Sequence, residues 1–505
     1  MRKLAKENTA IGTDSQIKLL FTAILLMFVV IASVFAVILS ESGIESGYTF
    51  PYLFPWIFLT AFVLLTPLVI RYYKGTFNLF DPIVFSIWTY FIPVYVLGGI
   101  IFASGLNLPY FTAFIDDPQV NLPLTYFYFL MGMIGLFLGF QIKFAKNIGA
   151  AISKKLPVLN WDADRIVLPA LILLGIGIWF NLSAWISGVL GFQRVDQYDA
   201  FDNIQYVLSL LVVEGSLLLW LFIFRTKQRN FNFYAVLSIL IIIIPLRTMI
   251  AGSRGSLFLN FLMIAMAYVF SGRKLNAKNS VVFGIILVSV IFIGMIYGTT
   301  FRNVKGTESK VSTEEYVDSA FRTIDVITST NPTIVLSEAL GNLGERLENV
   351  SALAVVVSNY EKLAPYEAAY GMENNIWTYT WTAFIPRFIW NDKPIVSDAR
   401  AYSELYFNFG ENSFPMTTVG DLLRNFGPLG IPLGMCFLGF CLRILYAGLI
   451  ENQAFSVWRT TTYFMLMTRV SHEGFYGTIL PEMMRTAILI AFSLLIIKFV
   501  LKGRN

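Results

Sequence analysis

Long apolar runs separated by short polar links follow one another along almost the whole chain. Most of these runs approach the roughly 20 residues that a helix needs to cross the hydrocarbon core of a bilayer. The pattern therefore predicts an all-α polytopic membrane protein with about twelve transmembrane helices. The expected spans are Lys18–Leu39, Tyr52–Ile70, Ile83–Phe102, Leu122–Phe140, Ile166–Ile186, Tyr206–Phe224, Phe233–Ile250, Leu257–Phe270, Val281–Tyr297, Pro428–Leu445, Trp458–Thr468 and Thr486–Leu501.

Lysine and arginine residues concentrate on every second link between the expected spans. Arg2, Lys3 and Lys6 precede the first span, whereas the link that follows this span carries Glu41 and Glu45 and no cation. Links rich in Lys and Arg stay in the cytoplasm, so this alternation fixes the direction of each span. Because the number of expected spans is even, both termini are predicted to be cytoplasmic.

One polar segment, residues 298–427, is much longer than the other links and is expected on the outer side of the membrane. A loop of this length within a compact domain is usually functional or disordered, and its many aromatic residues argue against disorder. The spacing of apolar residues predicts helices at Ser319–Ile327, Pro332–Leu340 and Glu345–Lys362. No repeat or linker is evident, so we expect a single membrane domain, 1–505, that contains this outer loop.

The composition supports the same class of protein and excludes several functions. Of all residues, 56% are hydrophobic and 14% are charged, whereas a soluble protein averages about 25% charged residues. Neither a Walker-A loop nor a Rossmann fingerprint occurs, which disfavours a nucleotide-driven enzyme or pump. The single histidine and the absence of HExxH or CxxC runs give little support to metal-dependent chemistry. The two cysteines, Cys436 and Cys441, are five residues apart in one apolar run and are not expected to pair.

Aromatic rings and cations are interleaved in the stretch from 377 to 398, WTYTWTAFIPRFIWNDKPIVSD. It contains Trp377, Trp381 and Trp390, with Arg387 and Lys393 between and after them. Such rings often anchor a helix that lies flat on the bilayer surface. The alternative is a binding site, in which the cations hold an anionic headgroup and the rings stack on sugars.

A second group of arginines is expected near the outer surface. Arg247 and Arg254 flank a hairpin, RTMIAGSRG, whose returning span is too short to cross the bilayer fully. Arginine at such depth usually faces the bundle interior, where its planar fork suits phosphate oxygens. The alternative is snorkelling of the side chains to lipid headgroups. Arg302 follows the ninth span and either joins this cluster or marks the interface.

Three further residues are candidates for a general base. Asp421 lies three residues before Arg424, so the two share a face of a helix and either form an intrahelical ion pair or contribute to a site. His472 and Glu473, near the outer end of the eleventh span, could accept a proton from a sugar hydroxyl. The alternative for them is a polar helix end in contact with water. Gly427 beside Pro428 predicts a turn or kink into the tenth span.

Three short stretches give the chain a resemblance to a known family. They are AGSRG at Ala251–Gly255, FIPRFIWNDKP at Phe384–Pro394 and VGDLLRNFGPLG at Val419–Gly430. With about twelve spans and one large outer loop, the chain resembles the oligosaccharide repeat-unit polymerases, the O-antigen polymerase (Wzy-type) family of bacterial cell envelopes. The related O-antigen ligases usually carry a histidine in the large loop, whereas His472 follows the next span, which disfavours a ligase.

The resemblance implies a GT-C-like fold and a glycosyltransferase of the bacterial cytoplasmic membrane that needs no cofactor. Such an enzyme moves a nascent O-antigen, capsule or exopolysaccharide chain from polyprenyl (undecaprenyl) diphosphate to the next lipid-linked repeat unit. A chain-length regulator and membrane lipids are the other expected partners, and nucleic acid is not. The cations that would bind the diphosphate are Arg247, Arg254, Arg302, Arg387 and Lys393. The tryptophans that would stack on sugars are Trp377, Trp381 and Trp390. The candidates for the base are Asp421, His472 and Glu473.

Three alternatives stay open, and one of them is O-antigen ligase activity, which differs from the polymerase in its acceptor. A flippase or transporter of lipid-linked sugars would show internal repeats and functional charges near the bilayer midplane. An enzyme that uses a polyprenyl-monophosphate sugar would place acidic residues in the first outer loop, where Glu41 and Glu45 are candidates.

Overall fold

The computed structural model describes most of the chain and shows it to be helical. The described residues are 49–105, 110–157, 159, 161, 165–187, 201–227, 229–251, 254–273, 277–306, 312–331, 333–335, 347–385, 387–393, 397–410 and 413–502. All regular secondary structure within these ranges is helix, and none of it is strand. The expected first span, Lys18–Leu39, and the acidic residues Glu41 and Glu45 lie outside the described residues.

Eight helices in the described part of the chain are long and apolar enough to cross a membrane, in agreement with the predicted all-helical class. They are Pro51–Tyr73, Pro82–Ala103, Pro118–Gln141, Val167–Ile186, Ile204–Arg225, Val281–Lys305, Thr418–Leu449 and Tyr476–Lys502. Each one overlaps an expected span.

Three of the other expected spans coincide with helices that are less clearly membrane-spanning. Helices α11 (Phe231–Ala251) and α12 (Arg254–Phe270) match the seventh and eighth spans. Helix α20 (Val457–Met467) matches the eleventh but has only 11 residues, a rise of about 16 Å against a hydrocarbon core of about 30 Å. Every residue of α20 is buried in the protein, so other helices surround it, and at this length it is too short to cross the bilayer by itself.

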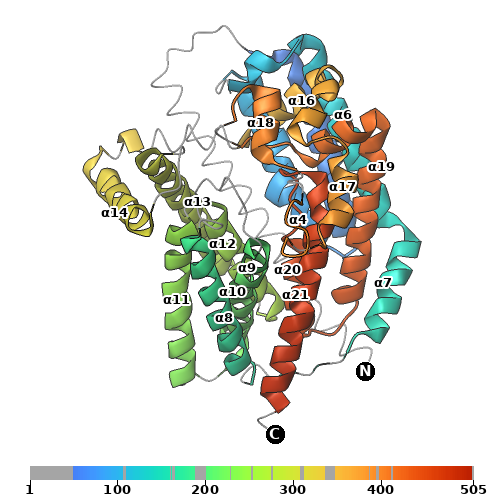
Figure 1. Cartoon of the computed structure of the whole chain (residues 1–505). Helices are drawn as coiled ribbons and strands as arrows, with labels where there is room; N and C mark the ends of the chain where they lie inside the picture. The colour runs from blue at the N-terminus through green and yellow to red at the C-terminus, as the bar shows by residue number, and fades with distance from the viewer. Residues whose placement is uncertain are drawn as a thin grey trace.

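The helices form two groups joined by the C-terminal part of the chain (Figure 1). Helices α8 to α14 make up one group, and α3 to α7 with α16 to α19 make up the other, while α20 and α21 contact both. The remaining elements are η1 (Pro51–Leu53), α3 (Phe54–Tyr73), α4 (Pro82–Ser86), η2 (Ile87–Leu97), α5 (Gly98–Ala103), η3 (Tyr110–Phe114), α6 (Pro118–Gln141), α7 (Lys143–Lys155), α8 (Val167–Ile186), α9 (Asp202–Ser209), α10 (Leu211–Arg225), α13 (Ala277–Lys305), α14 (Thr313–Ser329), α16 (Val350–Leu363), η4 (Ala364–Tyr370), α17 (Asn375–Thr382), α18 (Ala399–Phe407), α19 (Thr418–Leu449) and α21 (Tyr476–Lys502).

The long outer segment contains the helices that its periodicity predicted wherever the structure describes it. The expected helix Ser319–Ile327 lies within α14, which begins at a capping box of Ser312 and Glu315. The expected helix Glu345–Lys362 corresponds to α16. Much of the expected helix Pro332–Leu340 falls outside the described residues. Helix α14 packs on α13, whereas α16 packs on α6 and α19, so the two parts of the segment belong to different groups of helices.

Close packing of α6 against α19 is the largest helix–helix contact in the fold and depends on glycine. A Cβ atom built on Gly139 would lie 1.9 Å from the carbonyl oxygen of Cys436, and one on Gly135 would lie 2.4 Å from that of Pro432. Small residues let two apolar helices approach until their backbones touch, which is how helices associate where there is no water to exclude. Larger side chains at these two positions would force α6 and α19 apart.

Helix α19 is broken near its N-terminal end. Gly427 has φ 67° and ψ −171°, which no helical residue adopts, and Pro428 follows it. The segment Thr418–Phe426, here called the α19 arm, folds back so far that a Cβ on Gly434 would lie 2.3 Å from the Leu422 side chain. The turn or kink that Gly427 and Pro428 predicted is therefore confirmed. Broken helices in membrane proteins expose backbone groups and usually border a binding site or a cavity.

Candidate functional site

A buried ion-pair network occupies the centre of the α19 arm. One guanidinium nitrogen of Arg424 donates to Glu367 at 2.8 Å and to the carbonyl oxygen of Met372 at 2.9 Å. The other nitrogen donates to Asn375 at 2.6 Å and to Asp421 at 2.8 Å. The Arg424 and Asp421 side chains are almost completely inaccessible to solvent. The arm is thereby tied to η4 and α17, because Glu367 and Asn375 belong to those elements.

Asp421 uses both of its carboxylate oxygens within this network. One oxygen accepts from Asn375 at 3.2 Å, from Asn425 at 3.2 Å and from Arg424, and the other accepts from the backbone N–H of Gly477 at 3.1 Å. The intrahelical ion pair that the sequence suggested for Asp421 and Arg424 is confirmed. A general base must face its substrate with a free oxygen, so the geometry assigns Asp421 to positioning the arm against α17 and α21.

Glu367 is the second carboxylate of the network. It accepts a hydrogen bond from Tyr406 of α18 at 3.0 Å in addition to the ion pair with Arg424. Burial raises the pKa of Glu367, and the charge of Arg424 only partly opposes this rise. One arginine thus serves two buried carboxyl groups, an arrangement in which the loss of the cation would leave both without a counter-charge.

Three cations meet at the other end of α17. The Lys393 side chain is buried and donates to the carbonyl oxygen of Ile385 at 3.1 Å. Burial, followed by the neighbouring charges of Arg485 and Arg387, lowers the pKa of Lys393 to about 8. Arg485 of α21 is held by the Ala383 carbonyl oxygen at 2.7 Å. We call Arg387, Lys393 and Arg485 the cation cluster; it brings together two of the sequence-predicted cations and one that the sequence analysis missed.

The three predicted tryptophans belong to α17 and to the segment that follows it. Trp381 and Trp390 stack with ring centroids 5.8 Å apart and planes at 19°. Trp377 is 64% exposed and makes an edge contact with Phe426 at the end of the α19 arm. Trp381 is 55% exposed. Trp377 and Trp381 thus present surface that a ligand or lipid could contact.

His472 lies in the protein interior, so the expectation of a polar helix end in contact with water is wrong for this residue. It is 5% exposed and its Nε2 pairs with Ser86 Oγ at 2.9 Å. The ring packs against Phe91 and Tyr90 of η2, which is wound as a π-helix. Burial lowers the pKa of His472 to about 3. A neutral imidazole with such a pKa is a poor proton acceptor, because its conjugate acid loses the proton readily.

Glu473 is exposed and lies next to the start of the α19 arm. Its carbonyl oxygen accepts from the backbone N–H of Thr417 at 3.0 Å, and that of His472 accepts from Thr418 at 3.2 Å. These two backbone bonds hold the backbone of residues 472 and 473 against the start of the α19 arm. Of the three candidate bases, Glu473 is the only one whose side chain is exposed to solvent in the structure.

A buried carboxyl group that the sequence analysis missed, Glu348, lies close to this region. It has no accessible surface and accepts hydrogen bonds from the backbone N–H and the hydroxyl of Ser351 at the start of α16. Burial raises the pKa of Glu348 to about 7. The segment that carries Glu348 packs directly on the backbone of α5 at Gly98, because a Cβ at Gly98 would lie 2.1 Å from the Leu347 carbonyl oxygen. The dipeptide Glu348–Asn349 before an apolar helix is the only sequence signal for it.

The remaining predicted cations do not all join the cluster. Arg302 lies near the end of α13, beside the small core of Phe301 and Tyr316 where α14 packs, and Figure 1 shows α14 well apart from α17. Arg247 and Arg254 lie at the adjoining ends of α11 and α12. The side chains of these two arginines are outside the described residues, so their predicted part in a phosphate site stays a prediction.

The geometry supports binding of an anion next to aromatic rings more than it supports metal chemistry. Within the described ranges, no three His, Cys, Asp or Glu side chains come close enough to hold a metal ion. The cation cluster provides guanidinium and ammonium donors near exposed indole rings, and the Arg424 network holds α17 and the arm in place.

The comparisons with known proteins give a family but no function. The family described as Domain of unknown function (DUF8712) matches residues 172–467. A search of curated proteins found no match, and neither did a search of solved structures. The match covers more than half of the chain and includes α17, the α19 arm and the whole of α20.

Proposed function

We propose that this chain, which belongs to the DUF8712 family, is a polymerase of lipid-linked oligosaccharide repeat units. In this proposal it transfers the nascent glycan from polyprenyl diphosphate to the next lipid-linked unit at the outer face of the bacterial cytoplasmic membrane. The observation that carries the proposal is the cation cluster of Arg387, Lys393 and Arg485 beside the stacked Trp381 and Trp390. A diphosphate needs cations, and sugar rings stack on indole faces.

The chemistry follows from the charges that change during transfer. The bond from the anomeric carbon to the diphosphate oxygen breaks, a bond to the acceptor hydroxyl oxygen forms, and the hydroxyl proton goes to a base. Negative charge develops on the leaving diphosphate, and cations fixed in a site with little water stabilise it more than bulk solvent would. Arg485 is held by Ala383, Tyr379 and an ion pair with Glu482 before any substrate binds, which lowers the reorganisation that the reaction requires.

The proton acceptor in this proposal is Glu473. Glu473 is exposed beside the arm and matches the sequence-based proposal. Glu348 has no accessible surface and both of its carboxylate oxygens accept from Ser351, so it fails the requirement that also excluded Asp421. Glu473→Gln should therefore remove turnover while leaving substrate binding intact, and wild-type turnover in this variant would remove the assignment.

The test uses the purified full chain in detergent or nanodiscs with lipid-linked repeat units. Wild-type protein is expected to make a ladder of longer glycans, also in the presence of EDTA. Arg387→Ala and Lys393→Ala should abolish the ladder, whereas the control Arg322→Ala, an exposed arginine of α14 paired with Asp318, should leave it unchanged. A ladder that persists in both cluster variants would remove the site assignment, and absence of any ladder from wild-type protein would remove the polymerase.

A second function is favoured by one observation. Helix α19 is discontinuous at Gly427, and transporters often build their substrate sites from broken helices. A flippase of lipid-linked sugars would carry labelled lipid across proteoliposomes without elongating it. Under the polymerase proposal, elongation occurs and such movement stays at the rate of empty liposomes.

A further inference from the structure

A cavity lies at the opposite end of α19 from the broken arm. It has a volume of about 1030 Å³ and is lined by the C-terminal ends of α3, α6 and α19, the N-terminal side of α4 and α7, and the link from 450 to 456. Pro428–Leu449 separates it from the arm, about 30 Å of helix. The cation pattern of the sequence predicts that this end of the protein faces the cytoplasm.

The lining of the cavity is strongly basic. Positive side chains outnumber carboxylates by four. The cations are Arg71, Lys74, Lys143, Lys146, Arg443 and Arg459, and the carboxylates are Asp81 and Glu451. A concave surface with this excess of one charge concentrates the electric field and attracts anions.

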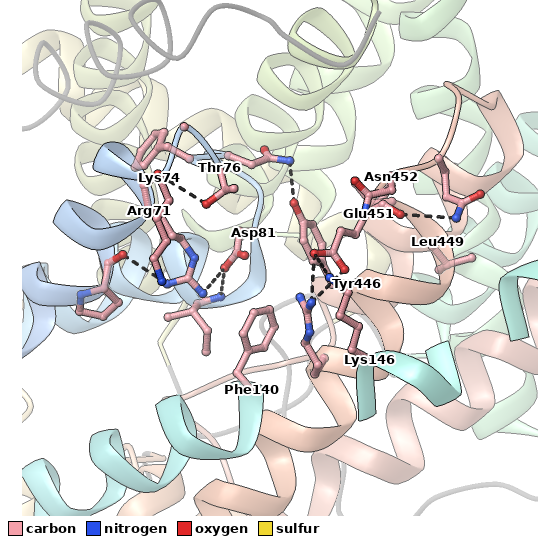
Figure 2. A pocket seen from close by; sticks show the side chains of 18 of the residues that line it. Arg71, Lys74, Thr76, Asp81, Phe140, Lys146, Tyr446, Leu449, Glu451 and Asn452 are labelled. Atoms are coloured by element: carbon pink, nitrogen blue, oxygen red, sulfur yellow. Dashed lines mark hydrogen bonds and ion pairs between the residues drawn. The ribbon is translucent and has the colours of Figure 1, made fainter. Parts of the chain in front are cut away.

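The ring of Phe140 contacts two arginines of the lining, Arg71 from α3 and Arg443 from α19. The guanidinium carbon of Arg71 lies 5.5 Å from the centre of the Phe140 ring, and that of Arg443 lies 5.1 Å from it. Arg71 also pairs with Asp81 at 3.3 Å and Arg443 with Glu451 at 2.9 Å. Figure 2 shows Arg71 and Asp81 on one side of the cavity and Glu451 on the other, with Phe140 between them. These arginines are therefore positioned before any ligand binds.

Two lysines complete the lining without being neutralised by a carboxylate. Lys74 and Lys143 are exposed and have no ion-pair partner in the part of the chain that the structure describes. Lys146, in contrast, shares Glu451 with Arg443 at 3.3 Å. The two lysines thus leave positive charge at the cavity for a ligand to neutralise.

One wall of the cavity is apolar and continues onto the outer surface of α3. Phe62, Val63, Pro67 and Ile70 form this wall. Phe62 is 71% exposed and Ile70 is 46% exposed, and the exposed apolar side chains of a membrane-spanning helix face lipid. A ligand with a charged head in the cavity and a hydrocarbon tail along α3 would satisfy both surfaces.

We propose that this cavity binds the phosphate or diphosphate group of an anionic ligand, with the tail of a lipid-carried ligand lying along α3. Arg71, Arg443, Lys74 and Lys143 provide the charge, and the α3 wall selects a lipid-carried group over a free one. The site is far from the cation cluster and does not depend on the glycan transfer proposed above.

The test measures binding to the purified full chain in detergent by isothermal titration. The probes are farnesyl diphosphate, which has a diphosphate on an isoprenyl tail, and inorganic pyrophosphate. The variant Lys74→Gln/Lys143→Gln removes two unpaired cations from the lining. The matched control, Lys154→Gln/Lys155→Gln, removes two exposed lysines of α7 that lie outside the lining.

Wild-type protein and the control should bind farnesyl diphosphate equally, and the cavity variant should bind it about tenfold more weakly, as expected for the loss of nearby charge. Weaker binding of pyrophosphate than of farnesyl diphosphate supports a lipid source, and equal binding supports a soluble phosphate. No binding of either probe to wild-type protein, or the same affinity in the cavity variant and the control, would overturn the proposal.

Discussion

Replacing Arg424 by methionine tests whether the ion-pair network holds the α19 arm in place. Methionine keeps the length of the side chain but donates none of the four hydrogen bonds that Arg424 makes to Glu367, Met372, Asn375 and Asp421. Two carboxyl groups then share a buried site without a counter-charge. We expect the variant to fold less stably and the arm to separate from η4 and α17.

The expected loss of stability depends on the hydrogen bonds that each carboxyl group keeps when Arg424 is replaced. Removing one member of a buried ion pair costs about 3–5 kcal/mol, because the partner stays buried and uncompensated. Glu367 keeps the hydrogen bond from Tyr406, and Asp421 keeps three donors, among them the N–H of Gly477. The remaining donors prevent a larger loss, so we expect a cost of about 4 kcal/mol in the free energy of unfolding.

The loss of stability in Arg424→Met should depend on pH, and the direction of this dependence follows from the pKa of Glu367. The pKa of Glu367 is already raised by burial, and it rises further when Arg424 is absent. A group whose folded-state pKa exceeds its unfolded value stabilises the fold below the unfolded pKa, and this contribution is lost as the pH rises through the folded pKa. The deficit of Arg424→Met relative to wild type should therefore shrink as the pH is lowered.

The assay follows unfolding of the purified protein in detergent. A thiol-reactive fluorophore reports when Cys436 and Cys441, both free and half-buried, become exposed on heating, and an SDS titration gives the free energy of unfolding. Arg322→Met is the matched control, because its ion pair with Asp318 is exposed and worth less than about 1 kcal/mol. Adding Glu367→Gln to Arg424→Met should recover part of the loss. Equal stability of Arg424→Met and Arg322→Met would refute the reasoning.

Three further predictions concern packing, pH and the cation cluster. Gly139→Leu should prevent α6 from packing on α19 and lower the melting temperature sharply, whereas Gly175→Leu, where a Cβ meets no atom within 4 Å, should not; equal melting temperatures would contradict the contact. Burial lowers the pKa of His472 to about 3, so the unfolded state takes up a proton at higher pH than the folded state does. The free energy of unfolding should therefore fall by about 2 kcal/mol between pH 6.5 and pH 5. A His472→Gln variant that loses the same stability over this pH range would disprove this. Lys393, with a pKa of about 8, should make glycan elongation fall as the pH rises above about 8, and Lys393→Arg should move that fall to higher pH; an unchanged pH profile would show that Lys393 does not bind the diphosphate.

The apolar runs predicted the helices well because length and hydrophobicity are local properties. Every expected span that falls among the described residues coincides with a helix, with ends that differ by a few residues in most cases. Helix α20 differs from the other predicted spans, because the apolar run predicted that it crosses the membrane. Its eleven residues are all buried against other helices, and a short window of sequence carries no information about which neighbours cover a helix.

The candidate site was predicted in part. Arg387 and Lys393 are close in sequence and were expected to act together, and the ion pair of Asp421 with Arg424 follows from helical spacing. The sequence analysis missed Arg485, which belongs to α21 and reaches α17 only through tertiary packing. It also expected His472 at a wet helix end, although the π-helical η2 encloses the ring.

The sequence alone determined that the chain crosses a membrane as helices, that a long polar segment joins two of them, and that α19 breaks at Gly427. Each of these follows from hydrophobic length or backbone stereochemistry, which act within one stretch of chain. Only the tertiary structure decided that Arg424 serves both Asp421 and Glu367, that Glu348 is buried, and that Phe140 lies between Arg71 and Arg443. These are contacts between segments far apart in sequence, and their energies depend on burial, which exists only once the helices have packed.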